Sequence, residues 1–198
     1  MKEKIQNKKP LVIPPSITKV DEQLKELNGG GKGKRVRIVI LEDWLRFKKM
    51  MRRAIAAPHR EIHFGSNEEE VAELLCLEYF DMIIWVGWGV PPDRSVNQHN
   101  MEYKEWGRNP ENAVRKSFKI MLTPPEKGIE FENPSPYIIA IFPREKEFMS
   151  KETCEELGIK QQIVGPPDSL HTGEFKKRLK KAVEIAEQEL GYREKNFV

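Results

Sequence analysis

Residues Arg35 to Trp44 read RVRIVILEDW, and this stretch decides the fold class of the chain. Ile38 to Leu41 are apolar at every position, as in a strand that is buried on both faces of a parallel sheet. Glu42 and Asp43 follow it directly, and in open α/β sheets ligands and ions bind at the carboxyl ends of the strands. Two adjacent carboxylates suit a hard cation such as Mg²⁺, so Glu42 and Asp43 are the candidate metal ligands.

Strand and helix patterns alternate from this run to the end of the chain. Strands are predicted over Val36–Leu41, Glu61–Phe64, Asp81–Val86, Tyr137–Phe142 and Gln161–Val164. Helices are predicted over 44–57, 68–78, 111–121, 146–157 and 174–190, where apolar residues recur at helical spacing. This alternation predicts an α/β fold with a doubly wound, five-stranded parallel sheet, and right-handed crossovers place helices on both faces.

Two segments interrupt the alternation. Residues 1–34 form a basic N-terminal arm, with a short helix predicted over Ile17–Leu27 and a glycine-rich linker at Asn28–Gly33. Residues 93–135 are polar and rich in Asn and Pro, which predicts an insertion after the third strand, with one helix inside it. Residues 35–198 are therefore predicted to form one domain that carries this insertion.

The bulk composition narrows the function classes. The formal net charge of +3 over 198 residues is too small to indicate nucleic-acid binding by itself, and residues 1–35 hold nine basic and four acidic side chains. Cys76 and Cys154 have no metal-ligand spacing and are predicted to be free thiols in a reducing compartment. No apolar run is long enough to span a membrane, and the N-terminus has no secretory signal pattern. A cytoplasmic protein is expected.

Four stretches resemble the receiver domain of bacterial response regulators. Leu41–Trp44 resembles the acidic pair that holds Mg²⁺ in that family, and Phe80–Pro92 resembles its third strand with the loop that follows. Tyr137–Phe142 resembles the fourth strand, and Ile163–Pro166 the end of the fifth. The resemblance implies the flavodoxin-like strand order 2-1-3-4-5 and a regulatory role in signal transduction.

The chain departs from the family at the residues that perform its chemistry. The resemblance places the phospho-accepting aspartate at Gly87, or at Val86 if the loop carries one extra residue, and places the family's lysine at Gly165. Phosphoryl transfer to a carboxylate needs a nucleophile, a metal and a compensating cation together. The resemblance therefore implies a degenerate pseudo-receiver that is not an enzyme, with no cofactor apart from Mg²⁺ at the acidic pair.

Other interpretations of the carboxylates remain open. Asp43 could cap the helix that follows it, because Asp is a favoured N-cap residue. Asp93 is a weaker candidate for a surrogate phosphoacceptor. Asp81 begins the third strand at the opposite edge of the sheet and is expected to be solvated.

A protein partner is the expected ligand, and homodimerisation is considered as well. The final helix carries a basic cluster, in which Lys177, Lys180 and Lys181 are candidate partner-binding residues together with Trp88 at the end of the third strand. The alternatives are a small-molecule or nucleotide sensor and an enzyme similar to nucleoside deoxyribosyltransferases, for which residues 93–135 would form a lid. Nucleic-acid binding through the basic arm ranks last, because the lysine-rich segment has no interleaved aromatic residues.

Overall fold

The computed structural model describes residues 35–87, 110–142, 145, 148–165 and 172–192. Five strands form one parallel sheet: β1 (Val36–Leu41), β2 (Arg60–Gly65), β3 (Met82–Val86), β4 (Tyr137–Phe142) and β5 (Ile159–Val164). Their order is β2-β1-β3-β4-β5, so the predicted doubly wound α/β fold and its strand order are confirmed. The N-terminal arm at 1–34 lies outside the described residues.

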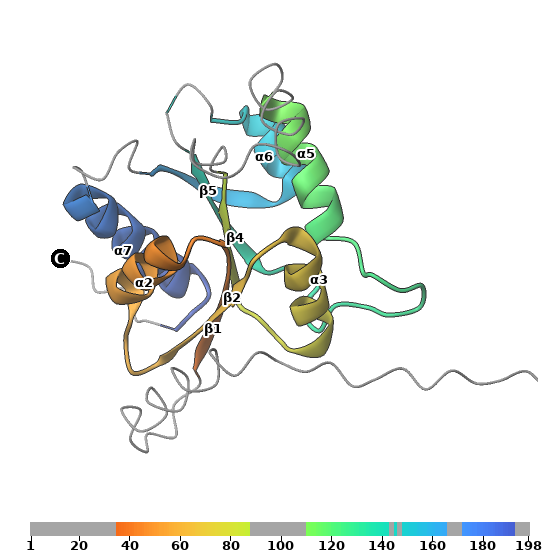
Figure 1. Cartoon of the computed structure of the whole chain (residues 1–198), viewed down its shortest axis with the longest axis horizontal. Helices are drawn as coiled ribbons and strands as arrows, with labels where there is room; N and C mark the ends of the chain where they lie inside the picture. The colour runs from red at the N-terminus through yellow and green to blue at the C-terminus, as the bar shows by residue number, and fades with distance from the viewer. Residues whose placement is uncertain (1–34, 88–109, 143–144, 146–147, 166–171, 193–198) are drawn as a thin grey trace, which may run out of the picture. The chain divides into compact units, whose positions relative to one another are not determined.

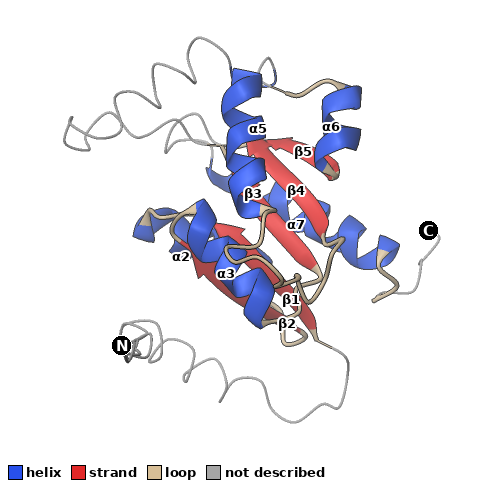
Figure 2. Ribbon diagram, turned by 90° about the vertical axis from the view of Figure 1, so that its right-hand side faces the viewer, coloured by secondary structure: helices blue, strands red, loops and turns tan. Residues whose placement is uncertain are grey.

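Helices cover both faces of the sheet (Figures 1 and 2). On one face lie α2 (Leu45–Ile55) and α7 (Thr172–Glu189). On the other lie α3 (Glu68–Leu77), α5 (Pro110–Met121) and α6 (Lys151–Leu157). Within the described residues, no helix combines the length and the apolar character that a membrane crossing requires.

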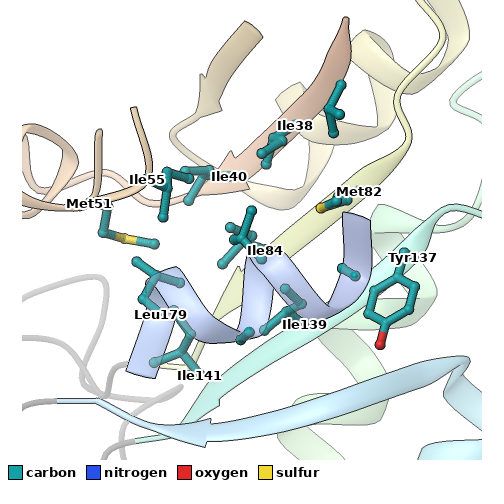
Figure 3. Close-up of a cluster of buried hydrophobic side chains, with 14 of the residues drawn as sticks. Ile38, Ile40, Met51, Ile55, Met82, Ile84, Tyr137, Ile139, Ile141 and Leu179 are labelled. Atoms are coloured by element: carbon teal, nitrogen blue, oxygen red, sulfur yellow. The ribbon is translucent and has the colours of Figure 1, made fainter. Parts of the chain in front are cut away.

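Each face of the sheet has its own hydrophobic cluster, because successive side chains of a strand point to opposite faces. Figure 3 shows the cluster under α2 and α7, where Ile38, Ile40, Met82 and Ile84 of the central strands meet Leu179 of α7. The opposite cluster, under α3, α5 and α6, includes Trp85, Phe118 and Phe142. The three central strands are therefore buried from both sides, which explains why their sequences are apolar at every position except Arg37 of β1.

The segment between β3 and β4 is only partly an insertion. The sequence predicts an insertion over 93–135, but residues 110–121 form α5, the helix that covers the sheet between β3 and β4. Val114, Phe118 and Met121 of α5 are fully or almost fully buried in the cluster on that face. This part of the segment belongs to the basic architecture, while residues 88–109 lie outside the described residues.

Several helix and strand boundaries differ from the predicted ones because of capping. Asn67 caps α3, since its side chain accepts a hydrogen bond from Glu70 N at 2.8 Å. Ser150 caps α6, which therefore begins at Lys151. Gly158 ends α6 in the left-handed conformation, with φ of 71°, and β5 begins immediately after it. That conformation favours glycine, which has no Cβ.

Asp81 is buried, whereas its place at the start of a strand predicts a solvated side chain. Its side chain lies at the amino edge of the sheet, and the residue is only 4% exposed. One carboxylate oxygen accepts a hydrogen bond from Arg37 N at 2.8 Å, and the other accepts one from the hydroxyl of Tyr192 at 2.6 Å. Asp81 thus links the start of β1 to the residues after α7.

Candidate functional site

Glu42 lies at the carboxyl edge of the sheet, between the ends of β2 and β3. Its backbone N–H donates to Gly65 O at 2.9 Å, which extends the pairing with β2. On the other side, Leu41 is paired with Trp85, so the next step of the parallel register places Val86 beside Glu42. Val86 is half-buried and packs against the cluster under α2 and α7.

The Glu42 side chain is buried and only half satisfied. The residue is 7% exposed, and its Oε1 accepts a hydrogen bond from Trp44 N at 2.8 Å. Its Oε2 has no hydrogen-bond partner among the described residues. Burial raises the pKa of Glu42 to about 7, a change that the nearby Asp43 carboxylate reinforces and that the Trp44 N–H and Lys48 oppose. The protonated form of this carboxyl group is therefore populated near neutral pH, where an ordinary glutamate is ionised.

Asp43 does not have the capping role that its sequence position suggests. The N-cap residue of α2 is Trp44, which makes no side-chain capping hydrogen bond, and the first turn of α2 has no acidic residue. Asp43 is exposed. It is Glu42 that binds the Trp44 backbone N–H, and Asp43 is not the N-cap residue of α2.

Lys48 acts electrostatically on both carboxylates of this pair, and it was not among the residues predicted for the site. Its Nζ donates to Ser66 Oγ at 3.1 Å. Burial lowers the pKa of Lys48, while Glu70, Glu42 and Asp43 act in the opposite direction. Lys48 lies on the first turns of α2, only a few residues after the acidic pair. This short separation is the feature of the sequence that could have identified it.

The residues present do not fit a magnesium site well. Mg²⁺ binds ionised carboxylates in near-octahedral geometry, whereas Glu42 is buried with a raised pKa and already accepts a hydrogen bond. Across the described ranges, no group of three or more His, Cys, Asp or Glu side chains could hold a metal ion. On the neighbouring strand β3, the residue beside Glu42 is Val86. Its apolar side chain cannot serve as a third metal ligand.

Gly87 and Gly165, the positions assigned to the family's aspartate and lysine, both lie buried at the carboxyl edge. The Gly87 N–H donates to Ile141 O at 2.9 Å, and the Gly165 N–H donates to Phe142 O at 2.7 Å. They flank the end of β4 from either side. Trp88 and Asp93 lie outside the described residues.

The three lysines predicted to bind a partner lie on the outer side of α7. Lys177, Lys180 and Lys181 are exposed. Lys177 forms an ion pair with Glu174 at 2.9 Å. A shallow depression elsewhere on the surface is lined by Lys151, Cys154, Glu155, Ile159, Lys160 and Gln162. It lies at the open side of β5 and contains none of the carboxyl-edge acids.

Comparison with known proteins finds similarity at the level of the fold. No family model matches the chain, and no curated protein matches it. Among solved structures, the response regulator domain of Thermotoga maritima CheB has 13% sequence identity and a TM-score of 0.46, over 78% of this chain and 95% of that one. A CheY-like receiver domain from Methanospirillum hungatei has 13% identity and a TM-score of 0.44, over 78% and 98%.

A third structure, the signal receiver domain of an HD domain-containing protein from Pseudomonas fluorescens, has 14% identity and a TM-score of 0.43, over 78% of this chain and 98% of that one. These values are too low to transfer a function. The receiver-type fold rests on the observed strand order, which is the flavodoxin-like order that CheY also has.

Proposed function

We propose that this chain is a regulatory module in signal transduction, a pseudo-receiver that does not accept a phosphoryl group and acts by binding a protein partner. The observation that supports it best is the residue beside Glu42. The register places Val86 there, and an isopropyl side chain that packs into the core offers no nucleophile. Forming an acyl phosphate would require a carboxylate at that point.

The other parts of a phosphoryl-transfer site are also weak at this edge. The end of β5 carries Gly165, which has no side-chain cation to neutralise a phosphoryl group. Glu42 is buried and its pKa is raised to about 7, so it is a poor ligand for the Mg²⁺ that such chemistry uses. If the chemistry is lost while the sheet is kept, the function that remains is recognition by a partner. The same proposal includes a cytoplasmic location. It also includes self-association, which is the simplest form of partner binding.

Phosphorylation by a small donor tests the proposal directly. The full chain is incubated with acetyl phosphate or phosphoramidate and Mg²⁺, and its intact mass is measured before and after treatment with hydroxylamine, which cleaves acyl phosphates. We expect no hydroxylamine-sensitive phosphoryl adduct. A matched variant, Val86→Asp, introduces a carboxylate beside Glu42. It shows whether a small phosphoryl donor can reach a carboxylate at this position.

The wild-type result decides the question. A hydroxylamine-sensitive adduct on any aspartate or glutamate of the wild-type chain, located by peptide mapping, would overturn the proposal. If the adduct fell on Asp93, the surrogate phosphoacceptor considered from the sequence would be the correct interpretation.

A further inference from the structure

The structure brings together two groups of basic residues that are far apart in sequence. Helices α2 and α7 lie side by side on one face of the sheet (Figure 1), and Phe47 of α2 stacks on Phe175 of α7 with ring centroids 5.6 Å apart. We call their outer surface the α2/α7 basic face. Its members are Arg46, Lys49, Arg53, Lys176, Lys177, Arg178, Lys180 and Lys181.

These side chains are open to solvent. All are exposed except Lys176, which is half-buried, and α2 itself contains no acidic residue. On α7, Lys176 and Lys180 share a side of the helix with Glu187, since these residues are spaced at whole helical turns. Glu187 binds Arg60 at the start of β2, the strand that follows α2. This side of α7 is therefore the side turned toward α2.

Acidic residues are concentrated elsewhere. Glu174 pairs with Lys177, and the other acids of α7 lie in its second half, at Glu184, Glu187 and Glu189. On the opposite face of the sheet, the first turn of α3 is Glu68-Glu69-Glu70. The formal net charge of +3 thus conceals a segregation of charge, and a segregated basic patch attracts a polyanion in one orientation.

An aromatic ring stands at the end of the basic face nearest the carboxyl edge. Trp44 is 44% exposed, and its ring is nearly parallel to Phe47, with centroids 6.4 Å apart and an interplanar angle of 6°. Phe47 stacks in turn on Phe175. This stack holds Trp44 in place before any ligand arrives, so binding would cost little side-chain entropy.

We propose that the α2/α7 basic face binds single-stranded nucleic acid, with phosphates on its lysines and arginines and a base stacked on Trp44. A groove of cations next to aromatic rings is the usual architecture for such binding. The lysines of α7 that the sequence assigned to a protein partner are here assigned to phosphates. The inference concerns a separate surface and does not depend on the absence of phosphoryl transfer.

The pattern of exposed residues favours this ligand over the other anionic ones. A membrane-surface helix presents a continuous apolar stripe to the lipid. The exposed residues of α2 are Leu45, Arg46, Lys49 and Arg53, so a single exposed leucine at its first position is followed by three cations and no apolar stripe. An acidic protein would satisfy the cations but would give no role to the flat ring of Trp44. Duplex nucleic acid keeps its bases stacked inside, out of reach of the ring.

The test is fluorescence anisotropy of the full chain with a labelled, mixed-sequence single-stranded RNA or DNA of about twenty nucleotides. We expect a binding constant whose logarithm falls with the logarithm of salt concentration, by about 0.7 per phosphate contact. Lys49→Glu/Lys180→Glu should weaken binding by about tenfold or more and make the salt dependence shallower. Trp44→Ala should weaken binding by about tenfold, with the salt slope unchanged.

The control variant Lys119→Glu/Lys160→Glu makes the same change in charge at exposed positions on α5 and β5, outside the basic face, and should bind like the wild type. Equal weakening by both double variants, or none by either, would overturn the proposal. Tighter binding of duplex DNA with no effect of Trp44→Ala would also overturn it. Binding of phosphatidylserine vesicles or polyglutamate without binding of the oligonucleotide would assign the face to a membrane or an acidic protein instead.

Discussion

Arg60 and Glu187 form a buried, two-pronged ion pair that fastens the start of β2 to the last turns of α7. Arg60 Nε donates to Glu187 Oε1 at 2.5 Å, and Arg60 Nη2 donates to Glu187 Oε2 at 2.7 Å. The side chains are 2% and 0% exposed. His59 also contacts Glu187, at 2.9 Å. Although burial opposes ionisation, the hydrogen bonds from Arg60 and His59 hold the pKa of Glu187 below its usual value.

Breaking this pair from one side should be severe. Glu187→Leu leaves the Arg60 guanidinium buried without its carboxylate, and we expect the free energy of unfolding to fall by about 3–5 kcal/mol. The double variant Arg60→Met/Glu187→Leu removes both charges and should lose much less than the sum of the single variants. Urea denaturation of the single and double variants measures this coupling. Additive losses would show that the pair is not energetically linked.

Glu42 should make stability depend on pH near neutrality. Burial raises its folded pKa from 4.5 to about 7, so between these values the folded chain holds a proton that the unfolded chain has lost. The resulting stabilisation is fully present below the unfolded pKa and is lost as the pH rises through 7. Relative to wild type, Glu42→Gln should gain on the order of 3 kcal/mol between about pH 5 and pH 8. Urea denaturation with EDTA present measures this difference.

The matched control is Asp43→Asn, which changes the neighbouring, exposed carboxylate. Its stability difference from wild type should vary little over the same pH range. If the curves of wild type and Glu42→Gln ran parallel, the protonation of Glu42 would be the wrong explanation.

Gly65 holds α3 close to the end of β2. A Cβ built there would lie 2.5 Å from Val71 Cγ2 and 3.2 Å from Val71 N, so a methyl group cannot fit without moving the helix. Gly65→Ala should therefore lower the free energy of unfolding by about 1–3 kcal/mol, as measured by urea denaturation. It should also disturb Glu42, whose N–H bonds to Gly65 O.

Two variants separate crowding from the other effects of an added methyl group. Val71→Ala, combined with Gly65→Ala, should recover part of the loss, since the clashing γ-methyl is gone. Gly173→Ala adds a methyl group where no atom of the described residues lies within 4 Å and, inside a helix, should be neutral or stabilising by up to about 1 kcal/mol. Equal destabilisation by both alanines would argue against the steric explanation.

The sequence predicts the fold well because local patterns encode it. Runs such as Ile138–Phe142 are apolar on both faces, and only a buried parallel strand accommodates them between turns. The stripe of Phe175, Leu179 and Val183 likewise predicts which side of α7 faces the sheet. Boundaries were less predictable: the helix predicted over 146–157 begins only at Lys151, because Ser150 caps it.

The site was less predictable because it depends on contacts between distant segments. No local pattern indicates that Glu42 is buried while the adjacent Asp43 is exposed, since burial follows from the way α2 packs back over β1. The basic residues of α2 and α7 are separated by more than a hundred positions, and only the fold makes them one surface. The burial of Asp81 was missed for the same reason. The hydroxyl that binds it belongs to Tyr192, which is far from it in the sequence.

The bond between Tyr192 and Asp81 gives the last prediction. Tyr192→Phe removes the hydroxyl that donates to Asp81 Oδ1 at 2.6 Å, and Asp81 remains 4% exposed with one fewer donor. We expect a loss of about 1–3 kcal/mol in the free energy of unfolding, measured by urea denaturation at neutral pH. Tyr79→Phe removes a hydroxyl from a residue that is 44% exposed, and should change stability by less than about 0.5 kcal/mol. Indistinguishable curves for the two variants would mean that α7 is held at this edge by Arg60 and Glu187, without help from Tyr192.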